Sequence, residues 1–217
     1  MIHDMDCCAK GYDEMFDDAQ AAKNLKSFRA DGPDPTTRAL LDMLRAGGVQ
    51  DATLLDIGGG VGAIHHELLD AGAQRATHVD ASAAYIRAAR EEAAKRGHAD
   101  RVEFLQGDFV DLAEQVAAAD VVTLDRVICC YPDMPALVEA SASRARRLYG
   151  AVFPRDRWFL RLAFPFMNLF KQLTGSGFRV FLHAPADIDT ELRRQGLERR
   201  SYAQTFVWAV AVYSRST

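Results

Sequence analysis

A glycine run that follows a short apolar segment is the stretch of this sequence best suited to bind a ligand. Leu54-Leu55-Asp56-Ile57-Gly58-Gly59-Gly60-Val61-Gly62 predicts a buried strand that turns into a helix starting near Ala63. Glycines let the backbone approach a ligand because no Cβ intervenes, and the following helix offers free N–H groups. Asp80 ends the next apolar run about 20 residues later, where a carboxylate can accept hydrogen bonds from a ribose diol. We therefore predict a nucleoside site.

Two nucleoside cofactors compete for this site. Gly58-x-Gly60-x-x-Ala63 also matches the dinucleotide fingerprint. Asp56 would repel a pyrophosphate, whereas it would attract the sulfonium and ammonium groups of S-adenosylmethionine (SAM). The sequence therefore favours SAM, and an NAD(H)-dependent dehydrogenase remains an alternative.

At this point the sequence resembles the class I SAM-dependent methyltransferases. The resemblance rests on Leu55–Gly62, on Asp80 in His78-Val79-Asp80-Ala81-Ser82, and on Gly107-Asp108-Phe109. It implies that the glycines cradle the methionine part of SAM, with a carboxylate beneath it. It also implies that Asp80 binds the ribose and that the third motif receives the adenine. The cofactor-binding residues implied are Asp56, Gly58, Gly59, Gly60, Asp80, Ala81, Ser82, Asp108 and Phe109.

Further candidates follow the predicted fourth strand and lie in the N-terminal region. Open α/β sheets place ligands at the carboxyl ends of their strands, so we expect Asp125 or Arg126 to contact the methionine end of SAM or the substrate. Tyr12 is similar to an aromatic residue that closes over SAM in many small-molecule methyltransferases. Arg29 is a candidate partner for the SAM carboxylate. Core packing for Tyr12 and a surface position for Arg29 are the alternatives.

The expected reaction is an SN2 transfer of the SAM methyl to oxygen, nitrogen or sulfur, with S-adenosylhomocysteine as the product. The sulfonium is already a good electrophile, so the protein mainly aligns the reactants and excludes water. A general base is needed only for an acceptor that is protonated at working pH. The candidates are His183, expected to end a strand over 178–182, then Asp125 and Tyr131. His65 and His66 are expected on a helix surface.

The acceptor is predicted to be a small apolar or aromatic molecule. Trp158–Phe170 is the most apolar stretch and suits the wall of such a pocket, although a core helix is the alternative. Ile128-Cys129-Cys130-Tyr131-Pro132 is loosely similar to the magnesium-protoporphyrin O-methyltransferases, which esterify a propionate. The cysteine pair departs from their pattern. Cys7-Cys8 and Cys129-Cys130 also leave open an arsenite methyltransferase, and a non-catalytic SAM-binding protein of the same fold remains a further alternative.

Composition limits the remaining classes. At 217 residues and 49% hydrophobic content, the chain suits one folded domain. Its net charge of −4, with cations spread along the chain, argues against a nucleic-acid partner. The acidic N-terminus predicts no signal peptide and the apolar runs are too short for a membrane span, so we expect a cytoplasmic protein. We expect no metal site because the cysteines lack C-x-x-C spacing. A homodimer is left open.

The elements that must position these residues alternate in the sequence. Residues 1–50 predict a helical cap, with a helix from Tyr12 to Lys26 and another capped by Thr36 or Thr37. Residues 51–217 predict the SAM-binding core. Strands are expected at 52–57, 75–80, 101–106, 120–125, 151–153, 178–182 and 205–213. Helices are expected at 62–72, 82–97, 109–118, 135–147 and 187–195. This alternation predicts a Rossmann-like α/β fold with seven mostly parallel strands, an antiparallel last strand and helices on both faces.

Overall fold

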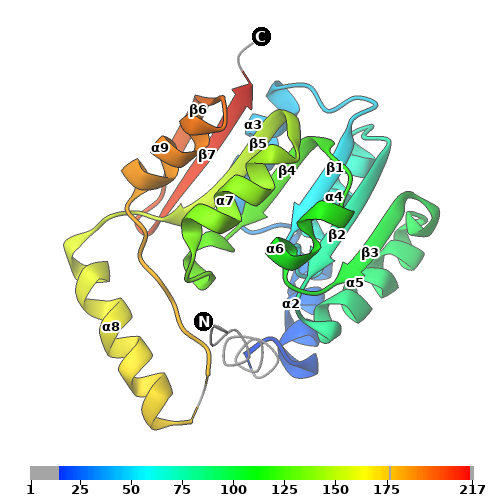
Figure 1. Ribbon diagram of the computed structural model, residues 1–217. Coiled ribbons are helices and arrows are strands. Elements are labelled where there is room, and N and C mark those ends of the chain that lie inside the picture. The colour runs from blue at the N-terminus through cyan, green and yellow to red at the C-terminus, as the bar shows by residue number, and fades with distance from the viewer. Residues whose placement is uncertain (1–14, 176, 216–217) are drawn as a thin grey trace.

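A seven-stranded sheet forms the centre of the molecule in a computed structural model, which describes residues 15–175 and 177–215 (Figure 1). The strand order is β3-β2-β1-β4-β5-β7-β6. Five neighbouring strands pair in parallel, and β7 runs antiparallel to both of its neighbours. The predicted Rossmann-like fold class is confirmed. The strands are β1 (Thr53–Ile57), β2 (Arg75–Asp80), β3 (Val102–Gln106), β4 (Ala119–Asp125), β5 (Ala145–Pro154), β6 (Leu197–Gln204) and β7 (Trp208–Arg215).

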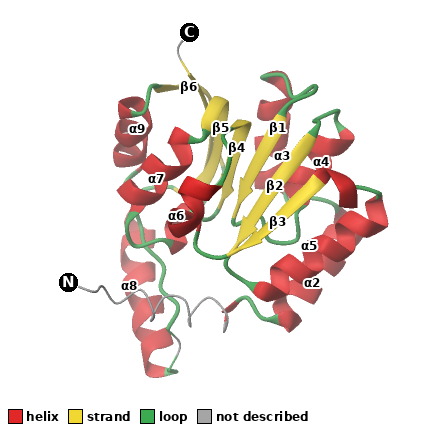
Figure 2. Ribbon diagram, turned by 45° about the vertical axis from the view of Figure 1, so that its right-hand side comes forward, coloured by secondary structure: helices red, strands yellow, loops and turns green. Residues whose placement is uncertain are grey.

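Helices cover both faces of this sheet (Figure 2). Apolar side chains of α6, α7 and α9 pack on one face, and those of α3 and α4 pack on the other. A third apolar cluster joins α2 to α5. The α-helices are α2 (Asp18–Asp31), α3 (Pro35–Ala46), α4 (Ala63–Asp70), α5 (Ala83–Arg96), α6 (Phe109–Leu112), α7 (Met134–Ser143), α8 (Trp158–Leu173) and α9 (Pro185–Arg194).

The central strands are apolar on both sides because helices cover both. Val121, Val122 and Leu124 of β4 are fully buried. In α3, Leu40, Leu41 and Leu44 share one face and are also fully buried. Spacing of three and four residues puts side chains on one side of a helix, so α3 presents an apolar stripe to the sheet.

The expected strand over 178–182 is wrong. These residues form an irregular segment after α8, and the strand that completes the sheet is β6. The segment is held from both sides: Asn168 of α8 exchanges two hydrogen bonds with the backbone of Val180, and the Phe181 N–H donates to the carbonyl of Cys129. The sequence did not predict β6, because it is an edge strand, where one side faces solvent and charged side chains are tolerated.

Several element boundaries also differ from those expected. α7 ends at Ser143 and β5 starts at Ala145, where a helix to 147 and a strand from 151 were expected. The first residues of β5 pair with β4 and β7, and this pairing overrides their helical pattern. α2 covers Asp18–Asp31, later than the expected Tyr12–Lys26, and Asp34 caps α3 in place of Thr36 or Thr37.

Within the described ranges, no helix combines the length and the apolar character needed to cross a membrane.

Candidate functional site

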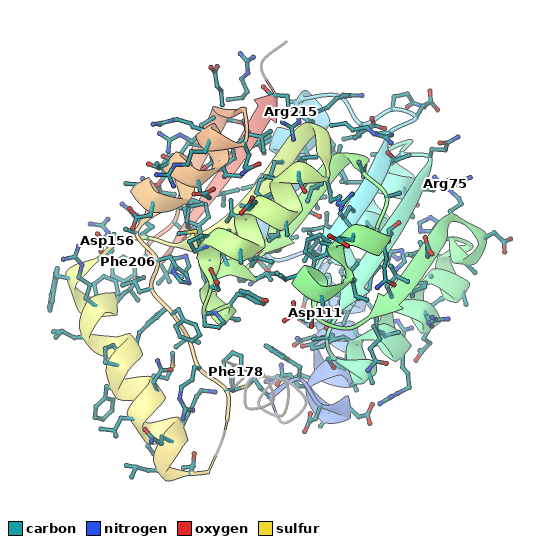
Figure 3. The ribbon with its side chains drawn as sticks, viewed as in Figure 1. Arg75, Asp111, Asp156, Phe178, Phe206 and Arg215 are labelled. Carbon is teal, nitrogen blue, oxygen red and sulfur yellow. The ribbon has the colours of Figure 1, made fainter. Side chains whose placement is uncertain are left out.

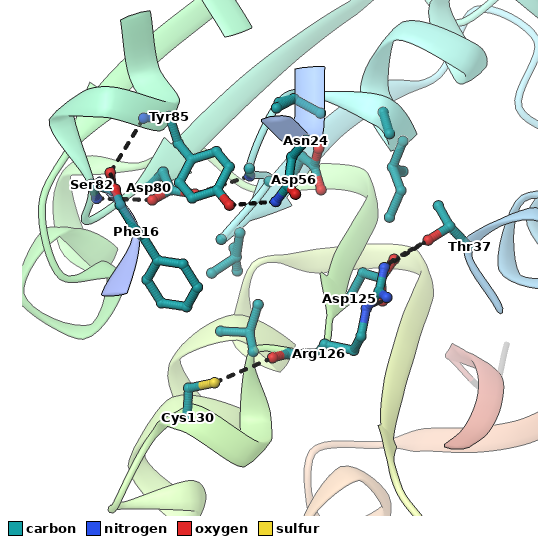
Figure 4. A pocket seen from close by; sticks show the side chains of 18 of the residues that line it. Phe16, Asn24, Thr37, Asp56, Asp80, Ser82, Tyr85, Asp125, Arg126 and Cys130 are labelled. Carbon is teal, nitrogen blue, oxygen red and sulfur yellow. Dashed lines mark hydrogen bonds and ion pairs between the residues drawn. The ribbon is translucent and has the colours of Figure 1, made fainter. Parts of the chain in front are cut away.

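A cavity of about 740 Å³ lies at the carboxyl ends of β1, β2 and β4, and Figure 4 shows part of its lining. The cap helices α2 and α3 contribute to the opposite wall. The structure brings most of the predicted site residues together here, although they span more than seventy positions of the sequence. The predicted residues that line the cavity are Asp56, Gly58, Gly59, Gly60, Asp80, Ala81, Ser82, Asp108, Phe109, Asp125, Arg126 and Tyr131.

The glycine turn at the floor of the cavity has no room for side chains. Gly58 adopts φ +60°, and a Cβ there would lie 2.5 Å from Cγ2 of Val127. A Cβ on Gly59 would lie 2.6 Å from His78 Nδ1 and 2.7 Å from Asp56 Oδ2. The turn is therefore pressed against the layer beneath it, and its backbone forms the surface that a ligand meets.

Asp80 connects the glycine turn to the start of α5. Its Oδ2 accepts a hydrogen bond from the Gly60 N–H at 2.9 Å, and its Oδ1 accepts one from the Ser82 N–H at 2.8 Å. Burial raises the pKa of Asp80 to about 6, against the opposing effect of these two N–H groups. The half-buried carboxyl lines the cavity and can still accept hydrogen bonds from a ligand.

Asp56 lies beneath the glycine turn inside a polar cluster. Thr123 Oγ1 donates to its Oδ1 at 2.8 Å, and His65 Nδ1 lies 3.0 Å from its Oδ2. His78 Nδ1 is 3.3 Å from His65 Nδ1. Burial raises the pKa of Asp56. The carboxyl is thus engaged by protein partners and supports the turn from below.

The histidines of this cluster correct the expectation for α4. His65 and His66 are fully buried and not on a helix surface, because their side of α4 faces β2 and the segment after α5. Burial lowers the pKa of His65 and His78 to about 3, so both are neutral at neutral pH. One donor atom each from Asp56, His65 and His78 lies within 4.8 Å of the others, which is compatible with a metal ion. Hydrogen bonding already accounts for these close contacts.

Asp125 ends β4, Arg126 follows it, and both connect the strand to the cap. Arg126, at φ +61°, places its Nε 2.9 Å from Asp125 Oδ1 and also pairs with Asp34. Thr37 Oγ1 donates to the other oxygen of Asp125. Burial raises the pKa of Asp125 despite the nearby guanidinium. For Asp34, hydrogen bonds from Thr36 and the charge of Arg126 outweigh burial and lower its pKa to about 2.

Tyr131 and Asp108 lie on the adjacent wall. The Tyr131 hydroxyl donates to Asp108 Oδ1 at 3.2 Å, and the same oxygen caps α6 by accepting from the Val110 N–H at 2.8 Å. Burial raises the pKa of Tyr131, and the neighbouring Asp108 raises it further. Tyr131 is therefore a poor proton acceptor at neutral pH.

Three predicted residues are not among the described lining of the cavity. His183 does not end a strand; its Nε2 lies 2.9 Å from the carbonyl oxygen of Tyr131, behind the wall. Arg29 pairs with Glu91 and Glu92 of α5 at 2.8 and 2.7 Å. Tyr12 lies outside the described residues, as do Cys7 and Cys8.

Other lining residues were not singled out as ligand contacts from the sequence. Asn24 Nδ2 donates to the hydroxyl of Tyr85 at 2.6 Å, and this pair closes the cavity between α2 and α5. The Cζ atom of Arg126 lies over the ring of Trp208, 5.9 Å from the ring centroid. The one local signal was Asp34 before Pro35, a typical helix start. The lining residues that sequence reasoning did not assign to the cofactor include Phe16, Asn24, Asp34, Thr37, Tyr85 and Trp208.

The cysteine pair also lines the cavity. Cys129 is buried and Cys130 half-buried, and their sulfurs are 3.9 Å apart. Both thiols also lie near the Arg126 carbonyl oxygen, at 3.3 and 3.6 Å. Both thiols therefore lie on the cavity wall in the segment that follows β4.

Charge on the cavity wall is strongly asymmetric. Among the described lining residues, six aspartates face two arginines, Arg38 and Arg126. Low-dielectric walls strengthen such a field. The cavity therefore favours a ligand that brings positive charge and disfavours a pyrophosphate. The aspartates are Asp31, Asp34, Asp56, Asp80, Asp108 and Asp125.

Comparisons with known proteins agree with this geometry. Residues 54–148 match the family model described as a methyltransferase domain. No match was found among curated protein sequences. The fold is similar to magnesium protoporphyrin IX methyltransferase (ChlM) from Synechocystis PCC 6803 with bound S-adenosylhomocysteine, at 21% identity and a TM-score of 0.71, covering 95% of this chain and 98% of that one.

Two further solved structures share the fold. One is the methyltransferase in a complex with the Haloferax volcanii Trm112 methyltransferase activator, at 18% identity and a TM-score of 0.70, covering 92% of this chain and 96% of that one. The other is the CcbJ methyltransferase from Streptomyces caelestis, at 17% identity and a TM-score of 0.63, covering 86% and 92%.

Proposed function

We propose that this chain uses SAM to methylate a small apolar or aromatic molecule. Its fold is that of the class I methyltransferases, and residues 54–148 match a methyltransferase domain, as the motifs predicted. The observation that carries the proposal is the convergence of three strand ends on one cavity. The glycine turn after β1, Asp80 at the end of β2 and Asp108 after β3 all line it. A nucleoside needs such a set of contacts, and the aspartates of the wall favour a nucleoside that carries positive charge.

The residues present fit SAM better than a dinucleotide. Asp80 would accept hydrogen bonds from the ribose, Asp108 would accept one from the adenine amine, and the glycine turn would support the methionine part. The excess of aspartates suits a sulfonium and an ammonium and opposes a pyrophosphate. When bound, SAM supplies an electrophilic methyl group, whose transfer leaves S-adenosylhomocysteine.

The chain's own contribution is alignment, because none of the three predicted base candidates is placed to act as a ready base. The pKa of Tyr131 is raised, Asp125 is held by Arg126 and Thr37, and His183 lies behind the wall. Asp125 and Arg126 would hold the methionine end or the acceptor. An acceptor that is already ionised at neutral pH, such as a carboxylate, needs no proton removal. We therefore favour a flat apolar carboxylate, compatible with the substrate named for the Synechocystis neighbour. Because the aspartates of the wall would repel its charge, Arg126 would have to be its cationic partner.

Calorimetry with SAM, S-adenosylhomocysteine and NADH tests the cofactor. We expect both SAM species to bind and NADH not to bind, and Asp80→Ala to abolish the binding. Release of S-adenosylhomocysteine is then measured with a panel of aromatic and tetrapyrrole carboxylates and their esters. Activity with the free acids alone supports carboxylate methylation. Binding of NADH in preference to SAM would overturn the proposal.

An arsenite methyltransferase is the second candidate, and the placement of Cys129 and Cys130 on the cavity wall favours it. Thiolates bind soft metalloids. Both cysteines line the cavity shortly after Asp125 and Arg126, which would hold the methionine end of SAM or the acceptor. Replacing the two cysteines by serine would abolish arsenite methylation and leave carboxylate methylation intact. A protein that binds SAM and releases no S-adenosylhomocysteine with either class would be the non-catalytic alternative.

A further inference from the structure

Helix α8 stands at the edge of the molecule (Figure 1), and among the described residues only one of its faces contacts the rest of the protein. On that inner face Leu160 is buried and Asn168 holds the backbone of Val180 with bonds of 2.8 and 2.9 Å. The ammonium of Lys171 lies 4.5 Å from the centre of the Phe178 ring. These contacts fix the rotation of the helix about its axis.

The outer face of α8 is a stripe of large apolar side chains that point to solvent. Their spacing of three and four residues places them on one side of the helix. Each is 54% to 78% exposed. Phe206, 74% exposed, stacks on Phe159 with ring centres 5.1 Å apart and lies close to the start of α8 (Figure 3). The stripe consists of Trp158, Leu162, Phe166, Leu169, Phe170 and Leu173.

Such a continuous apolar surface is unusual on a water-soluble domain. Exposed apolar residues normally occur singly, and a contiguous patch of them marks an interaction site. The stripe is separate from the cavity, since none of its six side chains lines it. Its role is therefore independent of ligand binding in that cavity.

The charge around α8 indicates what covers the stripe. Residues 155–179 carry five cationic side chains and one anionic one, a net charge of +4, in a chain whose net charge is −4. The single acid, Asp156, is paired with Arg161 at 2.6 Å. Trp158–Leu173 itself contains no acid. The cations are Arg155, Arg157, Arg161, Lys171 and Arg179.

We propose that α8 binds the surface of an anionic lipid bilayer, with the stripe among the acyl chains and the cations at the start of the helix, Arg155, Arg157 and Arg161, beside the headgroups. Trp, Phe and Leu on one side, with Arg and Lys nearby, are typical of helices that lie in the membrane interface. At 16 residues the helix lies on the membrane and does not cross it. This inference does not depend on the proposed methyl transfer.

A second copy of the chain is a poorer occupant for the same stripe. A two-fold contact through α8 would bring each basic segment against its own copy. Like charges at close range oppose such a contact. Phosphate headgroups, in contrast, neutralise the cations as the stripe is buried.

Sedimentation with lipid vesicles tests the proposal on the full chain. Vesicles of phosphatidylcholine alone are compared with vesicles of phosphatidylcholine and phosphatidylserine. We expect binding to the mixed vesicles, weaker binding to the neutral ones, and a blue shift of tryptophan fluorescence on binding. Phe166→Ser combined with Phe170→Ser should reduce the partition coefficient at least about tenfold, because two exposed rings no longer enter the acyl layer. Arg157→Glu should weaken binding to mixed vesicles only.

Tyr202→Ser on β6 is the matched control, since Tyr202 is an exposed aromatic residue outside the stripe. It should leave vesicle binding unchanged. Far-ultraviolet circular dichroism verifies that each variant is folded. The proposal is overturned if the wild-type chain binds neither vesicle, binds both equally, or loses no binding in the double variant. A lipid-free dimer that the double variant dissociates would also overturn it, because a second copy would then cover the stripe.

Discussion

Acidification from about pH 7 to about pH 5 should weaken nucleoside binding about tenfold through protonation of Asp80. The folded-state pKa of this carboxyl is raised to about 6 by burial. A ribose diol donates to the carboxylate, so the affinity is present above this pKa and is lost as the pH falls through it. Each unit below the pKa costs about 1.4 kcal/mol of binding free energy.

The buried histidines near Asp80 do not titrate in this interval. Burial keeps the pKa of His65 and His78 at about 3 and that of His66 at about 2, so these histidines stay neutral. Asp56, Asp108 and Asp125 are the competing carboxyls, because burial also raises their pKa. Two variants distinguish the contribution of the Asp80 carboxyl from that of the Asp108 carboxyl. Asp80→Asn should bind more weakly at pH 7, with no dependence on pH, whereas Asp108→Asn should keep the slope.

Calorimetry with adenosine at a series of pH values is the appropriate assay. Adenosine has the ribose and lacks the methionine groups, so ionisation of the latter cannot produce the slope. SAM is measured in parallel to verify that the intact cofactor follows the same trend. A flat profile for the wild-type protein, or a slope that persists in Asp80→Asn, would refute the assignment of Asp80 to the ribose.

Three further predictions concern stability and the cap. His78 has a pKa of about 3 in the folded protein against an ordinary value of 6.5, so its contribution to stability is full above pH 6.5 and is lost as the pH falls. At about pH 5 the free energy of unfolding should be about 2 kcal/mol lower than at neutral pH. In urea unfolding, His78→Phe should show a decrease between these pH values that is smaller than that of the wild type by this amount. Gly59→Ala should lower the free energy of unfolding by more than about 2 kcal/mol, because its Cβ would meet buried polar atoms. Gly97→Ala should lower it by about 1 kcal/mol, because its Cβ would meet nothing within 4 Å and only its φ of +74° is unfavourable. Equal losses of stability in thermal unfolding would contradict this reasoning. Arg126→Met should lower the free energy of unfolding by only about 1 kcal/mol, because the side chains of Arg126 and Asp34 are each more than a third exposed. It should also weaken SAM binding in calorimetry. Unchanged affinity for SAM would exclude a role for Arg126 in closing the cap.

Each strand-to-helix unit carries a recognisable local pattern, so the sequence correctly predicted the order of these strands and helices. Each motif lies within one such unit, where a buried strand, a turn and a helix follow each other directly. Asp56, Asp80 and Asp108 stand where a strand ends or just after it, so the parallel sheet necessarily brings them to one edge. The acidic residue before the glycines also predicted a positively charged ligand.

Edge strands and irregular segments gave weaker local signals. β6 is charged along its exposed side, so its pairing with β7 could not be read from hydrophobic alternation. Phe178–Leu182 has the composition of a strand, yet both edges of β7 are already paired. The hydrogen bonds from Asn168 and to Cys129 decide its path, and they come from distant parts of the chain.

The sequence by itself determined the fold class and the residues at the strand ends, because those depend on contacts within one strand-turn-helix unit. Only the tertiary structure decided what surrounds them. Packing of α4 against β2 buried His65 and His66, and the approach of α3 to β4 joined Asp34 to Arg126. The same packing left the stripe of α8 exposed, because a helix can bury only the face that a neighbour covers.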